Sequence, residues 1–274
     1  MPQPSLTGLP IAITGAGSGI GRATAIACAR AGMPVALAGR RTDRLHAVRD
    51  EITALGGRAV AIRCDVAHPD DCRTLIDACA SEFGRIYAVF ANAGYGLRGA
   101  VHELHDDAIR AIFETNFWGT LHTIRPALDH MIAARRGHVL ICSSCLSKLG
   151  APFTAPYSAT KAAQDHFGRA MRLELAPLGI RVSTIHPIGV DTEFAAAAAA
   201  RPPGADARNI PSPAAFTQSA DRVARAIIAC LRRPRGEVWT SLGARLAFAA
   251  AVACPGLADR VLRRSIPKPP AARP

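Results

Sequence analysis

Residues 14–21 of the chain read Thr14-Gly15-Ala16-Gly17-Ser18-Gly19-Ile20-Gly21, and this stretch predicts how the chain folds. An apolar run over residues 10–13 precedes it, and a helical pattern follows it from residue 20 to about residue 31. Glycines in such a turn allow a tight bend, a close approach of backbone to phosphate, and close packing of helix on strand. The free N–H groups of the helix N-terminus attract the phosphate charge. The stretch therefore predicts a phosphate-binding turn that opens an α/β fold.

The rest of the chain alternates short apolar runs with longer helical patterns. Strands are expected over residues 35–38, 59–64, 86–91, 139–143, 181–186 and 238–241. Helices are expected over residues 45–55, 72–83, 106–134, 155–178 and 221–231. The strand runs are apolar throughout, which is typical of a parallel sheet covered on both faces. The pattern predicts one domain with a doubly wound parallel sheet of about seven strands and helices on both faces.

The chain of 274 residues is long for one average domain and short for two, and we expect residues 1–241 to form a single catalytic and cofactor-binding domain. Residues 194–213 are rich in Ala, Pro and Gly and follow the sixth strand, on the side where ligands approach such sheets. We interpret them as a substrate lid or as a surface insertion. Residues 242–274 form a separate apolar and basic extension.

The chain is strongly basic, with a formal net charge of +12 and a sequence pI near 10.1. Basic chains often bind nucleic acid or anionic membranes. Here the arginines are spread along the chain, and no helix-turn-helix or RNP-like pattern is present. We therefore expect no nucleic-acid partner and interpret the basic surface as one that attracts phosphorylated cofactors.

The extension after residue 241 has two interpretations. Its apolar stretch, its break at Pro255-Gly256 and its basic end predict two short helices. They pack across a substrate cleft or a neighbouring subunit, or they lie on a membrane with Arg263, Arg264 and Lys268 facing anionic lipid. Residues 246–254 are too short to span a hydrocarbon core of about 30 Å, and we expect no secretory signal in the first residues, which lack a basic cluster followed by an apolar run. We expect a cytoplasmic protein that is membrane-associated only if the second interpretation holds.

Eight cysteines are scattered along the chain, and only Cys142 and Cys145 form a C-x-x-C pair. A zinc site would need a second pair of ligands, and nothing suitable follows, so no metal is expected. A redox role for this pair stays open. The alternative is that both residues form the wall of a pocket at a strand end.

The glycine spacing of the phosphate-binding turn is T-G-x-x-x-G-x-G, with glycines at 15, 19 and 21. In this spacing the chain resembles the short-chain dehydrogenase/reductase family in its common branch, and the resemblance extends to about residue 241. It implies a Rossmann-type fold, a nicotinamide dinucleotide cofactor, and hydride transfer between that cofactor and a carbonyl or alcohol substrate. The cofactor contacts that it implies begin with Thr14, Gly15, Gly17, Ser18, Gly19, Ile20 and Gly21.

The end of the second strand distinguishes NADP from NAD. An acidic residue there would bond the adenosine ribose and repel a 2′-phosphate, but this chain has Gly39-Arg40-Arg41. Guanidinium groups suit a phosphate, so we expect NADP(H) rather than NAD(H). Asp43 lies nearby but past the strand end, and Ser18 stands where some NADP-preferring relatives have a basic residue. The expectation therefore depends on Arg40 and Arg41, whose alternative is plain exposure on a loop.

Later strand ends also match the family. The resemblance implies that Asp65 and Val66 lie at the adenine and that Asn92-Ala93-Gly94 steadies the sheet beside the cofactor. It also implies contacts from Pro187, Val190 and Thr192 to the nicotinamide end. Ile188 stands where the family's P-G-x-V-x-T motif has glycine, and a β-branched residue excludes a positive φ, so the local turn is expected to differ.

Tyr157 and Lys161 are four residues apart in the segment Tyr157-Ser158-Ala159-Thr160-Lys161, which places them on one face of a helix. A phenol with a pKa near 10 is a poor base at neutral pH. A nearby ammonium favours the phenolate and is expected to lower that pKa. The pair can then exchange a proton with a substrate oxygen as hydride moves.

The family resemblance completes this pair to a tetrad of Asn116, Ser144, Tyr157 and Lys161. It implies that Ser144 bonds the substrate oxygen and that Asn116 anchors a water connected to the lysine. It also implies that the chain forms a homodimer or homotetramer. The alternative function is a catalytically silent dinucleotide-binding sensor, and such proteins usually lose the tyrosine or the lysine that this chain retains.

Overall fold

A computed structural model of the protein describes residues 4–190, 217–264 and 266. Thr192 and the expected lid over residues 194–213 lie outside the described residues. The expectations for both therefore stay predictions.

Seven strands of the described chain form one sheet in the order β3-β2-β1-β4-β5-β6-β9, and every neighbouring pair is parallel. The order reverses direction between β1 and β4, as in a doubly wound fold, so the predicted fold class is confirmed. The strands are β1 (Ile11–Thr14), β2 (Val35–Gly39), β3 (Ala59–Arg63), β4 (Ala88–Ala91), β5 (Gly137–Cys142), β6 (Ile180–His186) and β9 (Glu237–Trp239). A second, two-stranded parallel sheet joins β7 (Gly189–Val190) and β8 (Thr217–Gln218).

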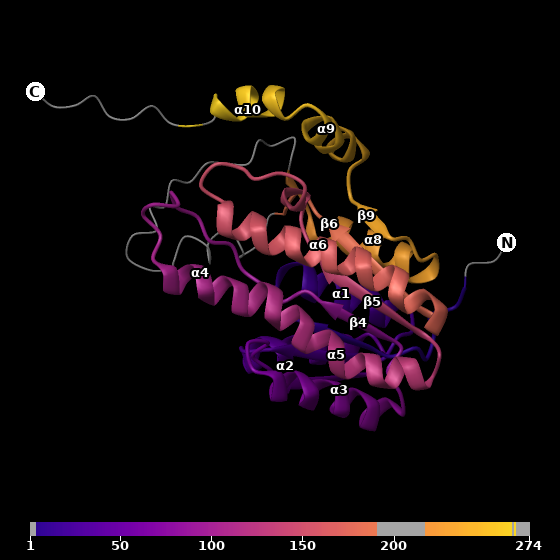
Figure 1. The fold of residues 1–274 in the computed structure, drawn as a ribbon. Coiled ribbons are helices and arrows are strands. Elements are labelled where there is room, and N and C mark those ends of the chain that lie inside the picture. Colours follow the sequence, from indigo (N-terminus) through magenta and orange to yellow (C-terminus); the bar gives the residue numbers. More distant parts are fainter. Residues whose placement is uncertain (1–3, 191–216, 265, 267–274) are drawn as a thin grey trace, which may run out of the picture.

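Helices cover both faces of the sheet (Figure 1). One face carries α1 (Gly19–Arg30), α2 (Thr42–Ala54) and α8 (Ala220–Arg232). The other carries α3 (Pro69–Phe83), α5 (Gly119–Ala133) and α6 (Ala155–Leu175). Short 3₁₀ turns cover Cys145–Ser147 and Ala176–Leu178. Each face therefore has its own apolar layer.

Neighbouring residues of a strand enter different layers, which explains the continuous apolar runs. In β1, Ile11 and Ile13 pack against the α1 and α8 side, whereas Ala12 packs on the α3 and α5 side. In β4, Phe90 and Val89 are divided in the same way. A strand buried on both faces has no solvent-facing position for a polar side chain. The strand segments are therefore apolar throughout because both faces of the sheet are buried.

The single helix expected over residues 106–134 contains one widened turn. It consists of α4 (Asp106–Phe113), a π-helical segment (Glu114–Trp118) and α5, all of which follow one another without a loop. π-helical turns of this kind are rare and occur frequently at functional sites. The widened turn holds Asn116, a predicted site residue.

The extension forms two short helices, as expected: α9 (Leu242–Ala253) and α10 (Pro255–Arg263). Both lie outside the two helical layers, at the top of Figure 1. Among the described helices, none is long and apolar enough by itself to cross a membrane. Together α9 and α10 reach that length and composition, but they bend by 111° at their junction.

Candidate functional site

The phosphate-binding turn has the backbone that its glycines predict. Gly15 adopts a φ of +67°, which side-chain-bearing residues rarely adopt. A Cβ on Gly21 would collide with the carbonyl oxygen of Gly15, so the first turn of α1 approaches the end of β1 as closely as a glycine allows. No acidic residue lies in that first turn, and its N–H groups face a cavity lined by Gly19 and Ile20. The turn therefore fits an anionic pyrophosphate.

Thr14 and Asn92 join the ends of β1 and β4 beside this turn. The Thr14 hydroxyl accepts hydrogen bonds from the backbone N–H groups of Asn92 and Ala93, at 3.0 and 3.1 Å. The Asn92 side chain donates to the Thr14 carbonyl at 2.9 Å. These bonds hold the ends of β1 and β4 together beside the turn.

A cavity of about 680 Å³ opens along the carboxyl ends of the strands. Most of the predicted cofactor residues line it: Gly15, Gly17, Ser18, Gly19, Ile20, Arg40, Arg41, Asp65, Val66, Asn92, Ala93, Gly94, Pro187 and Val190. The catalytic candidates Ser144, Tyr157 and Lys161 line it as well. Thr14, Gly21 and Asn116 do not line the cavity but contact residues that do, namely Asn92, Gly15 and Tyr95.

Two arginines stand at the cavity where β2 ends. The Arg41 guanidinium donates a hydrogen bond to the Ser18 hydroxyl at 3.2 Å, which joins the β2 end to the phosphate-binding turn. Arg40 Nη1 lies 3.9 Å from Asp65 Oδ2. The carboxylate of Asp43 points away, because its side chain is 78 % exposed and pairs with Arg44. The end of β2 therefore presents positive charge to the cavity.

Tyr157, Ser144 and Lys161 meet at the opposite end of the cavity. Tyr157 and Lys161 lie one turn apart on α6, with Lys161 Nζ 5.6 Å from the centre of the Tyr157 ring. Ser144 follows β5, and its hydroxyl lies beside the Tyr157 phenol and favours the ionised form of that phenol. Two hydroxyl groups and a buried ammonium thus converge at the cavity wall. This arrangement can hold a carbonyl or alcohol oxygen and exchange a proton with it.

The expected lowering of the Tyr157 pKa is wrong for the protein alone. Burial raises the pKa of Tyr157 above its ordinary value, and the Ser144 hydroxyl and the Arg98 charge offset this only in part. Burial also lowers the pKa of Lys161, whose ammonium group bonds to other partners. The Tyr157 phenol is therefore protonated at neutral pH and can act as a proton donor.

Asn116 is held by the widened helical turn. Its side-chain oxygen accepts from the Tyr95 N–H at 3.0 Å, and its amide donates to the Tyr95 carbonyl and the Thr160 hydroxyl at 2.9 and 3.1 Å. The amide of Gln164 donates to the Asn116 backbone carbonyl, and its oxygen accepts from Lys161. Gln164 thus joins Lys161 directly to the Asn116 carbonyl, and the link through a water stays a prediction.

Gln164 is a site residue that the sequence analysis missed. It is 1 % exposed and follows Lys161 by three residues, so it shares the buried face of α6. A polar amide on that inward face was the available signal. It could not be interpreted without knowing that the Asn116 carbonyl lies opposite.

A group of largely buried charged and polar side chains lies against the loop that contains Ser144. His186 Nδ1 lies 3.1 Å from the Ser144 carbonyl, and Asp165 Oδ1 lies 3.4 Å from His186 Nε2. Lys148 Nζ bonds to the carboxylates of both Asp165 and Glu237. Burial opposes the charge of Asp165, but hydrogen bonds from His186 and Lys148 outweigh it and hold the pKa of Asp165 below its ordinary range.

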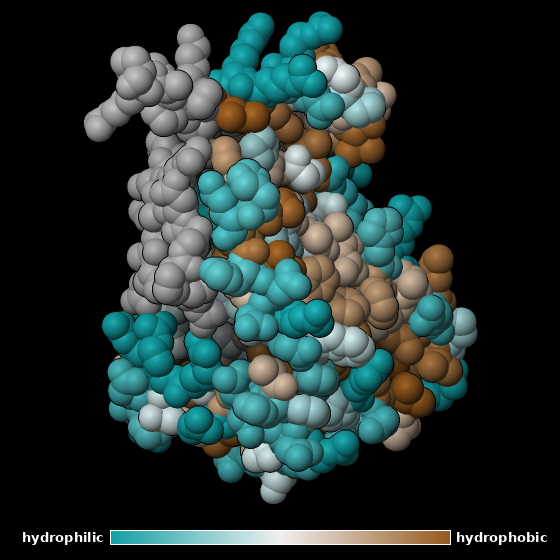
Figure 2. All heavy atoms as spheres, turned by 60° about the vertical axis from the view of Figure 1, so that its left-hand side comes forward, coloured by the Kyte–Doolittle hydropathy of each residue, from teal (hydrophilic) through white to brown (hydrophobic). Residues whose placement is uncertain are grey.

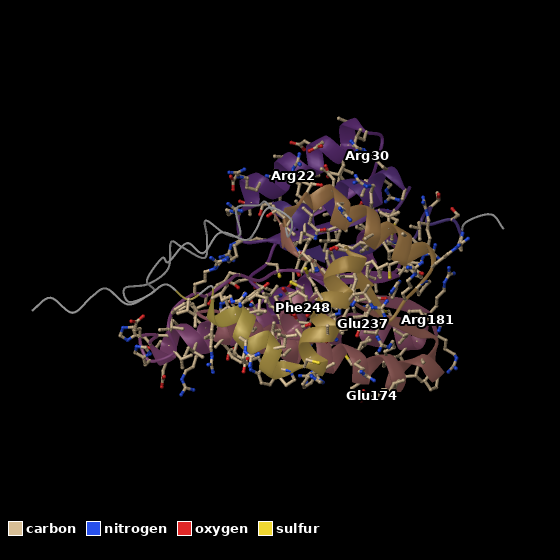
Figure 3. The ribbon with its side chains drawn as sticks, turned by 90° about the horizontal axis from the view of Figure 1, so that it is seen from above. Arg22, Arg30, Glu174, Arg181, Glu237 and Phe248 are labelled. Carbon is tan, nitrogen blue, oxygen red and sulfur yellow. The ribbon has the colours of Figure 1, made fainter. Side chains whose placement is uncertain are left out.

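Ile188 connects the site to the extension. In the place of the family's glycine, its side chain is 7 % exposed and packs in one apolar cluster with Cys145, Ala244 and the partly buried Phe248. Phe248, on α9, also lines the cavity, and Figure 3 places it near the centre of the molecule seen from above. The substitution at this position thus gives α9 an apolar contact beside the site.

Cys142 and Cys145 are buried free thiols that line the cavity, as the pocket-wall interpretation expects. Burial raises the pKa of the Cys145 thiol to about 11 and raises that of Cys142 as well. Thiolates are the reactive form of cysteine, so these values do not favour a redox role. The Cys142 backbone carbonyl has a separate use, because it accepts a hydrogen bond from Lys161 at 2.7 Å.

Comparison with known proteins agrees with this geometry. A family model described as short chain dehydrogenase matches residues 10–202. The uncharacterized oxidoreductase Lin0452 of Listeria innocua is 35 % identical over 186 residues, which cover 67 % of this chain and 75 % of that protein.

Two solved structures share the fold. A short-chain type dehydrogenase/reductase from Mycobacterium marinum has a TM-score of 0.76 and 30 % identity, covering 86 % of this chain and 94 % of the other. An alcohol dehydrogenase from Thermococcus sibiricus, complexed with 5-hydroxy-NADP, has a TM-score of 0.74 and 27 % identity, covering 84 % and 95 %.

Replacing the cation of the buried network tests its contribution to stability. We expect Lys148→Met to lower the free energy of unfolding by about 1–3 kcal/mol, because it leaves the Asp165 carboxylate buried with one partner fewer, while a lysine that is one-quarter exposed softens the loss. Urea unfolding measures the change. Arg22→Met is the control and should cost less than about 1 kcal/mol, since both groups of its pair with Glu51 are exposed.

The same comparison has a predictable pH dependence. Folding depresses the pKa of Asp165, so its stabilisation is complete above about pH 4 and is lost as the pH falls through the folded-state pKa. The difference between wild type and Lys148→Met should therefore shrink as the pH falls below about 4. A difference that is equal at all pH values would show that Lys148 acts through packing alone.

Proposed function

The chain belongs to the short-chain dehydrogenase family, and from this premise we propose that it transfers a hydride between NADP(H) and a carbonyl or alcohol substrate. Proteins of this family are oxidoreductases that bind nicotinamide dinucleotides. The observation that carries the proposal is the convergence of Tyr157, Ser144 and the Lys161 ammonium on the wall of the cavity that begins at the phosphate-binding turn.

Each catalytic residue has a role that follows from its contacts. Ser144 and Tyr157 hold the substrate oxygen between their hydroxyl groups, and Tyr157 donates a proton to that oxygen during reduction. In the oxidation direction Tyr157 takes the proton back. Lys161 stabilises the phenolate that forms when the proton leaves. The nicotinamide dinucleotide, when bound, supplies or accepts the hydride.

The preference for NADP(H) is supported by the charges at the end of β2. A 2′-phosphate carries negative charge, and Arg40 and Arg41 offer guanidinium groups beside Ser18 on the cavity wall. An NAD-specific site would offer a carboxylate to the ribose hydroxyls, and the nearby Asp43 points to solvent instead. The Asp65 side chain lies 3.9 Å from Arg40, and we assign it to the adenine of the cofactor.

The substrate end of the cavity favours a molecule with an apolar body. Leu97 and Leu146 line it from two loops, and Phe248 lines it from α9. The two loops are joined, because the Gly99 N–H donates to the Phe153 carbonyl at 3.0 Å. Among the described residues that line this end, the polar side chains include the catalytic hydroxyls, Arg98 and Thr154, and the apolar ones supply the main contact surface.

We further propose that α9 and α10 contact an anionic membrane surface. Leu242, Leu246, Leu257 and Val261 are each more than half exposed, which is unusual for side chains of this size. Arg245, Arg260, Arg263 and Arg264 accompany them with Asp259 as the opposing charge. Figure 2 shows apolar and hydrophilic side chains together at the top of the molecule, where these helices lie.

Charge favours lipid over a second copy of the chain as the occupant of this surface. In a symmetric pair the same arginines would face one another and repel, whereas anionic headgroups attract them. A membrane contact at α9 would also bring the bilayer next to Phe248 and the cavity. A cytoplasmic location stays a prediction, and a peripheral contact is compatible with it.

Self-association is proposed at a different face. Trp118, Phe167 and Leu173 are exposed apolar residues near and on α6, with exposed fractions of 40, 45 and 72 %. Many family members associate through their fourth and fifth long helices, which correspond here to the continuous α4–α5 stretch and to α6. This face presents the apolar residues that such pairing would bury. The sensor function is not favoured, because the chain retains both Tyr157 and Lys161 and both line the cavity.

Removing the Tyr157 hydroxyl tests the proposed chemistry. We expect Tyr157→Phe to lower kcat with NADPH and apolar ketones by about 10²–10⁴-fold, because the proton donor is lost. Nicotinamide absorbance measures the rate, and quenching of protein fluorescence measures NADPH binding, which should change little. Tight NADPH binding without turnover in the wild type, across ketones, aldehydes and alcohols, would favour the sensor function.

Neutralising the arginines at the end of β2 tests the cofactor preference. We expect the double variant Arg40→Ala, Arg41→Ala to raise the Kd for NADPH by about 10–100-fold and to leave the Kd for NADH nearly unchanged, because only NADPH has the phosphate that the guanidinium groups bind. Titration calorimetry measures both constants. Arg49→Ala, an exposed arginine on α2, is the matched control. An equal loss for both cofactors would contradict the assignment.

Polar substitution of α10 tests the membrane contact. We expect Leu257→Gln with Val261→Gln to abolish co-sedimentation with phosphatidylcholine vesicles that contain phosphatidylglycerol, and we expect added salt to weaken wild-type binding. Leu55→Gln, at the exposed end of α2, is the control. Binding that ignores both variant and salt would contradict the proposal. A variant that instead changes the sedimentation coefficient of the free protein would identify α10 as a contact between copies.

A further inference from the structure

Gln164 places a buried side-chain amide against the ammonium of Lys161. It lies on α6 among the buried residues of that helix, with 1 % of its surface exposed. Its side chain joins two groups that belong to the tetrad: the ammonium of Lys161 and the backbone carbonyl of Asn116. A buried polar group of this kind costs free energy unless its bonds are made, so its presence needs a reason.

The partners of Gln164 determine the orientation of its amide. Lys161 Nζ only donates hydrogen bonds, so it must face Gln164 Oε1, at 2.9 Å. The Asn116 carbonyl only accepts, so it must face Nε2, at 2.6 Å. The second amide hydrogen bonds to the Thr120 hydroxyl, also at 2.6 Å, and that hydroxyl donates to the Asn116 carbonyl at 2.7 Å. The side-chain oxygen of Gln164 and both of its amide N–H groups therefore have hydrogen-bond partners.

The Lys161 ammonium depends on such acceptors because it is 4 % exposed. Burial disfavours its charge, and the Cys142 carbonyl and Gln164 Oε1 both favour it. The titratable groups around it are the Cys142 thiol on β5 and Tyr157 on its own helix, and Arg98 acts on Tyr157 from the loop after β4. The π-helical segment and α5 present the neutral groups of Asn116 and Thr120.

We propose that Gln164 is a positioning residue that holds the Lys161 ammonium charged and in place beneath Tyr157 by tying it to the Asn116 carbonyl. The proposal rests on the proposed function for its catalytic meaning. The bridge itself does not depend on that function. In this proposal, the Gln164 side chain makes the connection between Asn116 and Lys161 that the family resemblance assigns to a water.

The chain offers an unusually clean readout of this bridge, because Lys148, Lys161 and Lys268 are its only lysines. In the protein labelled with ¹³C at the lysine ε-carbon, NMR titration follows each lysine separately, and Lys148→Arg and Lys268→Arg assign the signals. We expect Gln164→Met to lower the pKa of Lys161 by about one unit, because methionine keeps the volume but removes the acceptor. The signal of Lys148 should not shift.

A matched variant separates the bridge from packing. Thr120→Val removes a neighbouring buried hydroxyl and its bonds to Gln164 and Asn116 but leaves Gln164 Oε1 facing Lys161. We expect it to lower the thermal stability and to leave the pKa of Lys161 within a few tenths of a unit of wild type. An equal fall in both variants would overturn the proposal, since it would assign the effect to packing.

Gln164→Glu keeps the test decisive if Gln164→Met does not fold. Glutamate retains an oxygen that accepts from Lys161, whether or not its carboxyl is ionised, so the pKa of Lys161 should stay at or above its wild-type value. A fall in the pKa of Lys161 in Gln164→Glu would overturn the proposal. These measurements need neither cofactor nor turnover.

A kinetic readout links the bridge to the reaction. In alcohol oxidation the rate rises with pH as Tyr157 loses its proton, so a weaker Lys161 charge should move this limb of the kcat/KM profile about one pH unit higher in Gln164→Met. We expect kcat to fall about tenfold with the substrate KM nearly unchanged. An unshifted limb together with an unshifted Lys161 pKa would overturn the role of Gln164. Absence of hydride transfer in the wild type would instead refute the proposed function and leave the NMR result standing.

Discussion

The Lys161 ammonium is a positive charge buried where α6, the end of β5 and the π-helical segment meet, and the site is arranged around the need to satisfy it. Water would solvate such a charge, and a protein interior must replace that solvation with fixed acceptors. The Cys142 carbonyl supplies one acceptor and Gln164 supplies another. Both acceptors come from backbone or side chains that are themselves held by hydrogen bonds, so the charge has one position.

Neighbouring elements of the fold hold the acceptors of the Lys161 ammonium in place. The Cys142 carbonyl is available because β5 ends there, and Gln164 is oriented because the widened turn presents the Asn116 carbonyl to it. The Asn116 side chain in turn holds both the N–H and the carbonyl of Tyr95, at the start of a loop that lines the cavity. A one-residue widening of a helix thus connects the proton-transfer pair to the substrate wall.

The parallel sheet explains why a single cavity can hold both ends of the proposed cofactor. The carboxyl ends of β1 to β6 lie along one edge, and the order reverses between β1 and β4, which leaves a crevice there. The phosphate-binding turn and the arginines lie on one side of this crevice, and the Ser144 and Tyr157 hydroxyls lie on the other. The buried network of Asp165, His186 and Lys148 supports the second side from beneath.

The sequence alone determined the fold class, the phosphate-binding turn and the pairing of Tyr157 with Lys161, because each depends on local pattern, whereas Ser144 and Asn116 were implied by the family resemblance. Apolar runs indicate strands buried on both faces, glycines indicate tight turns, and a spacing of four residues indicates one face of a helix. The protonation of Tyr157, the direct bridge through Gln164 and the contact of Ile188 with α9 required the tertiary structure. Each of these depends on which distant groups surround a side chain, and the burial and hydrogen bonds that those groups create have no counterpart in local sequence pattern.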